Sequence, residues 1–206
     1  MNNCEFCAEF EKGNFGLNGI EDRILYKSDN FVVFPSVGQI VEGYLLITSK
    51  DHYISMGAVP EQLHAELESV EDKVRNVLGK VYTTPLFFEH GPISDKNRGG
   101  SCIDHAHFHC VPVDIDIVED LSRTFPYEQI SSFKGLTRIF EHHVPYFFVE
   151  ENKDRYVFNI NFPVFSQYIR RLIADKIGKP ERGDWRNYPG YDEMKRVIER
   201  LRPEFK

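Results

Sequence analysis

Three histidines, His105, His107 and His109, alternate with apolar residues near the middle of the chain. Successive side chains of a β-strand point to opposite faces, so an extended segment here would place the three imidazoles on one face and the apolar residues on the other. Three hypotheses fit such a face. It is a surface strand of unpaired histidines, a zinc site, or a nucleophilic histidine that attacks phosphorus while its neighbours supply protons or fix its tautomer.

A pair of cysteines with the spacing Cys-x-x-Cys, Cys4 and Cys7, lies near the start of the chain. Without a secretory signal, this spacing is more typical of half a metal site or of a redox pair than of a structural disulfide. Redox pairs usually lie where a strand of a βαβ unit meets its helix, and this pair does not, so a metal is favoured. The other cysteines, Cys102 and Cys110, have apolar neighbours and are expected to be buried core residues.

The composition excludes several classes of protein. Hydrophobic residues make up 41% and aromatic residues 14% of the 206 residues, which favours one globular domain, with or without an extension. The net charge of -7 argues against a general nucleic-acid binder. No apolar run approaches the ~20 residues of a membrane span, and the first residues lack the features of a signal peptide. We therefore expect a cytoplasmic protein with neither a nucleic acid nor a membrane as partner.

The last part of the chain differs in charge from the rest. Residues 165–206 contain 11 Lys and Arg against 7 Asp and Glu, which gives +4, and the remainder carries -11. Within this part, Gln167, Arg170 and Arg171 lie three and four residues apart, so a helix would place them on one face. That face either reaches a phosphate of a bound ligand or is an ordinary solvated surface.

Short runs of aromatic and β-branched residues predict strands, and apolar residues three and four positions apart predict helices. The predicted strands are 23–26, 31–34, 43–48, 85–90, the histidine segment, 146–149 and 156–160. The predicted helices are 60–79, which is the main one, 165–177 and 191–201. Loops are expected at 11–19, 91–100 and 180–189, and the signals weaken after Val113. The sequence predicts an α+β fold, with an antiparallel sheet and one main helix in residues 1–115 and an α/β extension in residues 116–206 on the same core.

The combination of these motifs resembles the histidine triad (HIT) superfamily, whose signature is His-φ-His-φ-His-φ-φ with φ hydrophobic. Residues 105–111 fit at every position. Cys4 and Cys7 resemble the superfamily's N-terminal Cys-x-x-Cys, and residues 43–52 resemble its strand that ends in Lys-x-His. The resemblance covers roughly residues 4–113, and it implies a HIT-like fold.

In the metal-containing relatives, which include galactose-1-phosphate uridylyltransferases, two cysteines and two histidines hold a zinc ion. The resemblance assigns these positions to Cys4, Cys7, His52 and His105. Four protein ligands form a closed, structural site that would tie the N-terminus to the histidine strand. For His52 the alternative is an ordinary polar residue at the start of a helix.

The resemblance also implies the chemistry. The middle histidine, His107, would attack the α-phosphorus of a nucleotide and form a nucleotidyl-histidine intermediate, which water or another acceptor resolves. His109 would contact the phosphate or relay a proton. The backbone of Gly99 and Gly100 and the hydroxyl of Ser101 would cradle phosphate oxygens, because glycine permits a close approach.

The chain departs from the superfamily's pattern at three places. Many members have Gly-Gln-Ser before the triad, where this chain has Gly100-Ser101-Cys102. Members often carry a ribose-binding aspartate after the second strand, where Ser36 follows Phe34 and Pro35, so Phe34 and Ser36 are the expected contacts to the nucleotide. Uridylyltransferases have glutamine at the third triad position, so His109 favours a hydrolase.

The segment of the extension around Gln167, Arg170 and Arg171 resembles segments of longer relatives, including members that process diadenosine polyphosphates. The expected function is therefore a nucleotide phosphate hydrolase that acts on a small-molecule nucleotide, with zinc as a structural cofactor. The alternatives are a nucleotidyltransferase or phosphorylase with the same intermediate, a nucleotide-binding protein without turnover, and a hydrolase with zinc on all three triad histidines. The protein would be a homodimer or a pseudo-dimeric monomer whose extension covers the dimer face.

Overall fold

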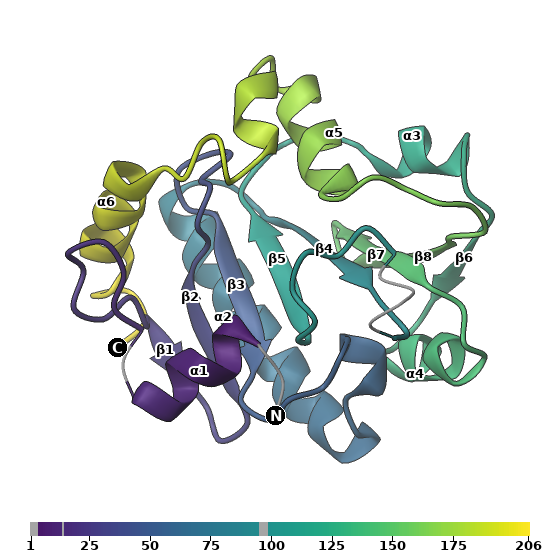
Figure 1. The fold of residues 1–206 in the computed structure, drawn as a ribbon, viewed down its shortest axis with the longest axis horizontal. Helices are drawn as coiled ribbons and strands as arrows, with labels where there is room; N and C mark the ends of the chain where they lie inside the picture. Colours follow the sequence, from purple (N-terminus) through teal and green to yellow (C-terminus); the bar gives the residue numbers. More distant parts are fainter. Residues whose placement is uncertain (1–3, 14, 95–98) are drawn as a thin grey trace.

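An antiparallel sheet runs through the molecule in the strand order β1-β2-β3-β5-β4-β7-β8-β6 (Figure 1). The computed structural model describes residues 4–13, 15–94 and 99–206. The strands are β1 (Tyr26–Lys27), β2 (Phe31–Pro35), β3 (Leu45–Ser49), β4 (Leu86–Gly91), β5 (His107–Val111), β6 (Tyr127–Ile130), β7 (Tyr146–Glu151) and β8 (Asp154–Asn159). The predicted α+β class with an antiparallel sheet is confirmed.

Helices cover both faces of this sheet. They are α1 (Glu5–Lys12), α2 (His64–Val81), α3 (Val118–Ser122), α4 (Lys134–Glu141), α5 (Tyr168–Lys176) and α6 (Tyr191–Leu201). The main helix α2 crosses behind the sheet in Figure 1, and α1 and α5 lie in front of it. Accordingly Val74 of α2 belongs to one apolar cluster, and Phe6 of α1 and Ile169 of α5 belong to another. None of the helices in the described ranges is long and apolar enough to cross a membrane.

The histidine strand β5 lies between β3 and β4, inside the sheet. Ala106, Phe108 and Cys110 are fully buried in the cluster that α2 covers. The alternation of side chains therefore turns His107 and His109 to the opposite face, on which α1 and α5 lie. This confirms the predicted separation of histidines from apolar residues, although β5 begins at His107 and His105 precedes it.

The N-terminal part differs from the predictions. The expected loop 11–19 begins too early, because residues 11 and 12 complete helix α1, which ends where Gly13 adopts a left-handed backbone with φ of 70°. Residue 14 of that loop, and residues 95–98 of the loop predicted at 91–100, lie outside the described residues. The expected strand 23–26 contributes only Tyr26 to β1, because the backbone N–H of Arg23 donates to the carbonyl oxygen of Phe15 and not to β2.

Two α-helices and one strand after Val113 were not predicted, namely α3, α4 and β6, and a short 3-10 helix, Pro180–Gly183, lies in the expected loop 180–189. Strand β6 has a single buried residue, Ile130, so its sequence carries no alternation that would reveal a strand. The helix expected at 165–177 begins at Tyr168, because Gln167 has a left-handed backbone with φ of 64°. Of the unpredicted elements, β6 extends the sheet beyond β8.

Residues on both sides of position 115 share the sheet. Strand β7 pairs with β4, with Phe88 opposite Val149. Buried ion pairs join α2 to these later strands, since Arg75 pairs with Glu150, and Arg155 lies 2.8 Å from Glu71. Residues after position 115 therefore share a sheet and buried ion pairs with earlier residues, and the division into a domain 1–115 and an extension 116–206 stays a prediction.

Candidate active site and metal cluster

Four residues that the sequence connects with a metal come together at one end of β5. The ligand atoms of Cys4, Cys7, His52 and His105 all lie within 4.8 Å of one another. The Nδ1 atom of His105 is 3.3 Å from Sγ of Cys4 and 3.6 Å from Sγ of Cys7, and Nδ1 of His52 is 3.3 Å from Sγ of Cys7. The start of α1, the segment after β3 and the segment before β5 supply these ligands.

The hydrogen bonding of His105 suits a metal ligand. Its Nε2 atom lies 2.8 Å from the carbonyl oxygen of Ser49. A carbonyl only accepts, so Nε2 carries the hydrogen and the lone pair of Nδ1 faces the two thiols, which is the usual orientation of metal-binding histidines. Two thiols and two imidazoles are a ligand set that zinc prefers. The residues present therefore fit a structural zinc ion.

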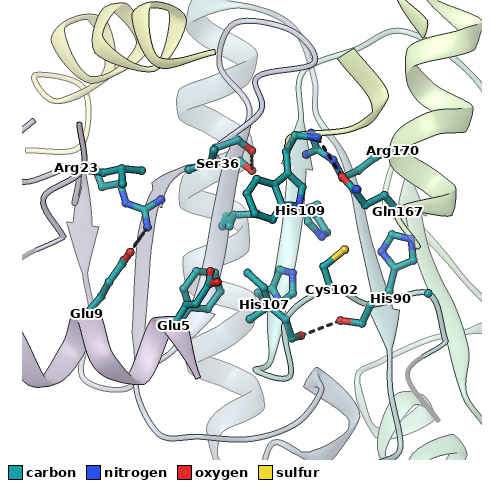
Figure 2. Close-up of a pocket in the computed structure, with 18 of the residues that line it drawn as sticks. Glu5, Glu9, Arg23, Ser36, His90, Cys102, His107, His109, Gln167 and Arg170 are labelled. Carbon is teal, nitrogen blue, oxygen red and sulfur yellow. Dashed lines mark hydrogen bonds and ion pairs between the residues drawn. The ribbon is translucent and has the colours of Figure 1, made fainter. Parts of the chain in front are cut away.

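A cavity of about 230 Å³ lies next to this cluster, between α1 and α5 on the same face of the sheet (Figure 2). Most of the predicted site residues line it: Ser36, Gly100, Ser101, His107, His109, Gln167 and Arg170. Three do not. Phe34 is buried beneath the guanidinium of Arg23, Gly99 lies outside the lining, and Arg171 forms an ion pair with Asp184 at 2.9 Å.

One hydrogen bond fixes the tautomer of His107. Its Nδ1 atom lies 2.6 Å from the carbonyl oxygen of His105, so Nδ1 donates a hydrogen, and Nε2 carries a lone pair with no hydrogen-bond partner among the described residues. Burial lowers the pKa of His107 below its usual 6.5, so the imidazole is neutral at neutral pH. A neutral imidazole with a free Nε2 atom in a cavity is competent as a nucleophile.

His109 lies beside it, with 4.7 Å between the two ring centroids. Its Nδ1 atom is 2.6 Å from the hydroxyl of Tyr44, and its ring stacks on Phe88 at 4.3 Å. Burial, with the charges of His107 and nearby groups, holds the pKa of His109 well below 6.5. The ring is therefore neutral and fixed in place.

The segment before the triad makes a tight bend at the cavity. Gly100 has φ of 81°, and a Cβ atom there would lie 3.1 Å from the carbonyl oxygen of Phe165, so the bend favours glycine. The hydroxyl of Ser101 donates to the carbonyl of Ile103 at 2.8 Å. Both residues lie at the cavity wall beside the histidines.

Sequence reasoning missed His90, which lines the cavity together with His107 and His109. Phe88 pairs with His109, so His90, two residues along β4, faces the same side as the triad. Its Nε2 atom accepts a hydrogen bond from the backbone N–H of Ile169 at 3.3 Å. Burial lowers the pKa of His90 to about 3, so this ring is also neutral. The strand 85–90 was predicted, but its register against the triad strand was not available from the sequence.

The prediction that Cys102 is a buried core residue was wrong, whereas Cys110 is buried as predicted. Cys102 is half-buried, lines the cavity, and has its Sγ atom 2.7 Å from Oγ of Ser166. It lies in a bend rather than in β5, so the alternation of the strand does not turn it into the core.

The α1 wall of the cavity was not predicted either. Glu5 and Glu9 line it from one face of the helix, four residues apart. Arg23 holds Glu9 through hydrogen bonds of 2.9 and 2.6 Å. The four-residue spacing of Glu5 and Glu9 predicts that they share a face only if the segment around the cysteines is known to be helical.

The structure thus combines an antiparallel sheet, an inner strand with alternating histidines, and a cavity on the histidine face. The chain belongs to the family described as "Protein similar to CwfJ C-terminal", whose family model matches residues 1–126. No protein in the curated collection searched matches the chain.

Several solved structures are similar. A HIT family protein from Bacillus anthracis has 19% identity and a TM-score of 0.46, covering 56% of this chain and 76% of that one. A Zn-bound histidine triad family protein from Mycobacterium smegmatis has 14% identity and a TM-score of 0.43, with coverages of 68% and 92%. A HIT family hydrolase from Clostridium thermocellum has 16% identity and a TM-score of 0.43, with coverages of 56% and 96%.

Proposed function

We propose that this protein is a nucleotide phosphate hydrolase in which His107 attacks the α-phosphorus of a nucleoside polyphosphate or a related nucleotide conjugate. The observation that carries the proposal is the tautomer and the charge of the His107 ring. His107 is neutral, its Nδ1–H is bound by the carbonyl of His105, and its Nε2 lone pair lies at the wall of the cavity. Such an atom can attack phosphorus without first losing a proton.

In the first step, the Nε2 lone pair of His107 forms a bond to the α-phosphorus. The bond from phosphorus to the leaving-group oxygen breaks, and its electron pair departs with that oxygen. The imidazole gains positive charge, which the carbonyl oxygen of His105 stabilises through the Nδ1–H bond at 2.6 Å. The backbone at Gly100 and the hydroxyl of Ser101 would contact the phosphate oxygens.

In the second step, water attacks the phosphorus of the nucleotidyl-histidine. The electron pair of the phosphorus–nitrogen bond returns to Nε2 of His107, and the proton of the water passes to the phosphate or to a neighbouring base. His109 is the neighbour within reach, because its ring lies 4.7 Å from that of His107 and is neutral. His109 would therefore relay the proton.

The predicted zinc would be held by Cys4, Cys7, His52 and His105. When bound, it supplies a cross-link between α1 and the residues before β5, with no open position for substrate. This role disfavours a hydrolase with zinc on all three triad histidines. Among the described residues, the ligand cluster contains His105 but neither His107 nor His109.

The proposal is tested by trapping the intermediate. The purified protein is mixed with nucleoside triphosphates and dinucleoside polyphosphates, quenched in single turnover, and analysed by intact-mass spectrometry. We expect an adduct of one nucleoside monophosphate, absent from His107→Ala and present in the control His142→Ala, which changes an exposed histidine. Turnover that requires inorganic phosphate would identify a phosphorylase, and nucleotide binding without any consumption would identify a binding protein.

A further inference from the structure

Among the described residues of the cavity, one buried cation, Arg170, has no anionic partner. The side chain of Arg170, on α5, is 3% exposed and lines the cavity. Its Nη2 donates to the carbonyl oxygen of Gly38 at 2.7 Å, and its Nε has no hydrogen-bond partner. Within the described part of the chain it forms no ion pair.

Other buried arginines are neutralised. Arg23 pairs with Glu9 at 2.6 Å, and Arg75 lies between Glu71 and Glu150. A buried charge without a partner is costly, because a neutral hydrogen bond recovers only part of the lost hydration. The unpaired guanidinium of Arg170 is thus an exception in this molecule, and it lies in the cavity that the proposed chemistry needs.

The surroundings hold this guanidinium in place. Gly38 has φ of 76°, and a Cβ atom at that position would lie 2.6 Å from Nη2 of Arg170 and 2.3 Å from Cβ of Trp185. On another side, the guanidinium lies 5.0 Å from the centroid of the Tyr44 ring. Only glycine leaves room for this arrangement, so Arg170 is positioned by the fold.

The cavity has opposite polarity at its two ends (Figure 2). Glu5, Glu9 and Arg23 line the end at α1, where the ion pair of Arg23 with Glu9 leaves the charge of Glu5 in excess, and Arg170 lines the end at α5. His90 lies at the α5 end as well. Its Nε2 accepts the N–H of Ile169, so the hydrogen of the neutral ring is on Nδ1, which makes His90 a further donor. Phosphate oxygens are repelled at the first end and attracted at the second.

We infer that Arg170, assisted by His90, forms an anion subsite for the leaving group of the reaction. The inference rests on the proposed function, in which His107 attacks the α-phosphorus. It narrows the class of substrate to nucleotides with an anionic leaving group, such as the distal phosphate of a nucleoside diphosphate. When the bond between the α-phosphorus and the bridging oxygen breaks, the electron pair stays on the departing phosphate. Arg170 balances that charge and so stabilises the departing phosphate.

Binding of inorganic pyrophosphate tests the subsite without turnover. We expect calorimetry to show binding to the wild-type protein that weakens with added salt, a loss of at least tenfold in Arg170→Met, and a smaller loss in Arg170→Lys, which keeps the charge. Arg200→Met removes an exposed arginine of α6 that pairs with Glu42, and it should bind as the wild type does. Absence of binding to the wild type, or equal binding to Arg170→Met, overturns the inference. If Arg170→Met does not fold, the test compares pyrophosphate binding by the wild type and by Arg170→Lys, and equal binding by these two proteins overturns the inference.

Kinetics with two substrates tests the role of the leaving group. A nucleoside diphosphate has an anionic leaving group, and the matching nucleoside phosphoramidate releases a neutral amine. We expect Arg170→Met to lower kcat/KM by about 100-fold for the first and by less than about threefold for the second. Equal losses for both would reduce Arg170 to a structural residue. If the wild type binds pyrophosphate but turns over neither substrate, the proposed function fails and the anion subsite remains.

Discussion

The Nδ1 atom of His107 lies 2.6 Å from the carbonyl oxygen of His105, the residue whose own Nδ1 atom faces the thiols of Cys4 and Cys7. One residue therefore belongs to the metal cluster through its side chain and orients the proposed nucleophile through its backbone. Because both interactions depend on the segment before β5, the structure of the cluster and the chemistry of the cavity are connected. Four predictions examine this connection and the surrounding fold.

Replacing His107 removes the free Nε2 atom while leaving the cavity walls in place. We expect His107→Ala to lower turnover by about 10⁴-fold or more, because the variant lacks the nitrogen that forms the phosphorus–nitrogen bond of the proposed intermediate. Nucleotide binding should change by less than about threefold, as measured by calorimetry. Residual turnover within tenfold of the wild type would contradict the assignment.

Replacing Cys7 tests the metal cluster. We expect about one zinc ion per chain in the wild type and little in Cys7→Ser, with a fall in Tm of about 5 °C or more, because α1 would lose its link to the residues before β5. Burial and the neighbouring Cys4 thiol raise the pKa of Cys7 to about 11, so zinc uptake should also release protons.

The matched control is Cys102→Ser, which changes a half-buried cysteine outside the cluster. It should keep the full zinc content. Elemental analysis and thermal unfolding measure both variants, and a zinc-free wild type purified without chelators would refute the prediction.

Glu89 predicts a dependence of stability on pH. Its carboxyl is 1% exposed and accepts hydrogen bonds from the backbone of Met56 and the hydroxyl of Tyr146, both at 2.7 Å. Burial nevertheless raises its pKa from 4.5 to about 8. Between these values the folded protein holds a proton that the unfolded chain releases, so the contribution to stability is complete below 4.5 and is lost as the pH rises toward 8.

The measurement is urea unfolding at several pH values. In this window the free energy of unfolding of the wild type should fall more steeply with pH than that of Glu89→Gln, by up to about 1.4 kcal/mol per pH unit. Glutamine keeps the shape of the side chain and does not titrate. Parallel curves for the two proteins would show that Glu89 has an ordinary pKa.

Replacing Gly38 by alanine should destabilise the protein in two ways, through the left-handed backbone at this position and through the atoms that the new Cβ would meet. Gly178 has nearly the same conformation, with φ of 71°, but a Cβ atom there would meet nothing within 4 Å. Gly178→Ala should therefore cost only the left-handed backbone term, about 1 kcal/mol. Gly38→Ala should cost roughly 3 kcal/mol or more, because its Cβ would collide with Trp185 and Arg170. Chemical denaturation of both variants measures the difference, and equal costs would show that the neighbours of Gly38 can move.

Much of the fold follows from local patterns. The alternation at the triad predicted which side chains enter the core, because a strand inside a sheet has no other way to place them. The main helix was predicted at 60–79 and observed at His64–Val81, since its apolar spacing is regular. The segments between 114 and 145 were missed because they are short and half-exposed, so they carry little periodicity.

The sequence alone determined which residue types are available: the alternating histidines, the paired cysteines and the glycine bend before the triad. Only the tertiary structure decided that His90 faces the same cavity, that Cys102 lines it, and that Arg170 is buried with no anionic partner in the described part of the chain. The physical reason is that these properties depend on strand register and on contacts between residues far apart in the chain, such as Arg170 with Gly38. Local propensity contains no information about such contacts, whereas the direction of a side chain along a strand is set by its immediate neighbours.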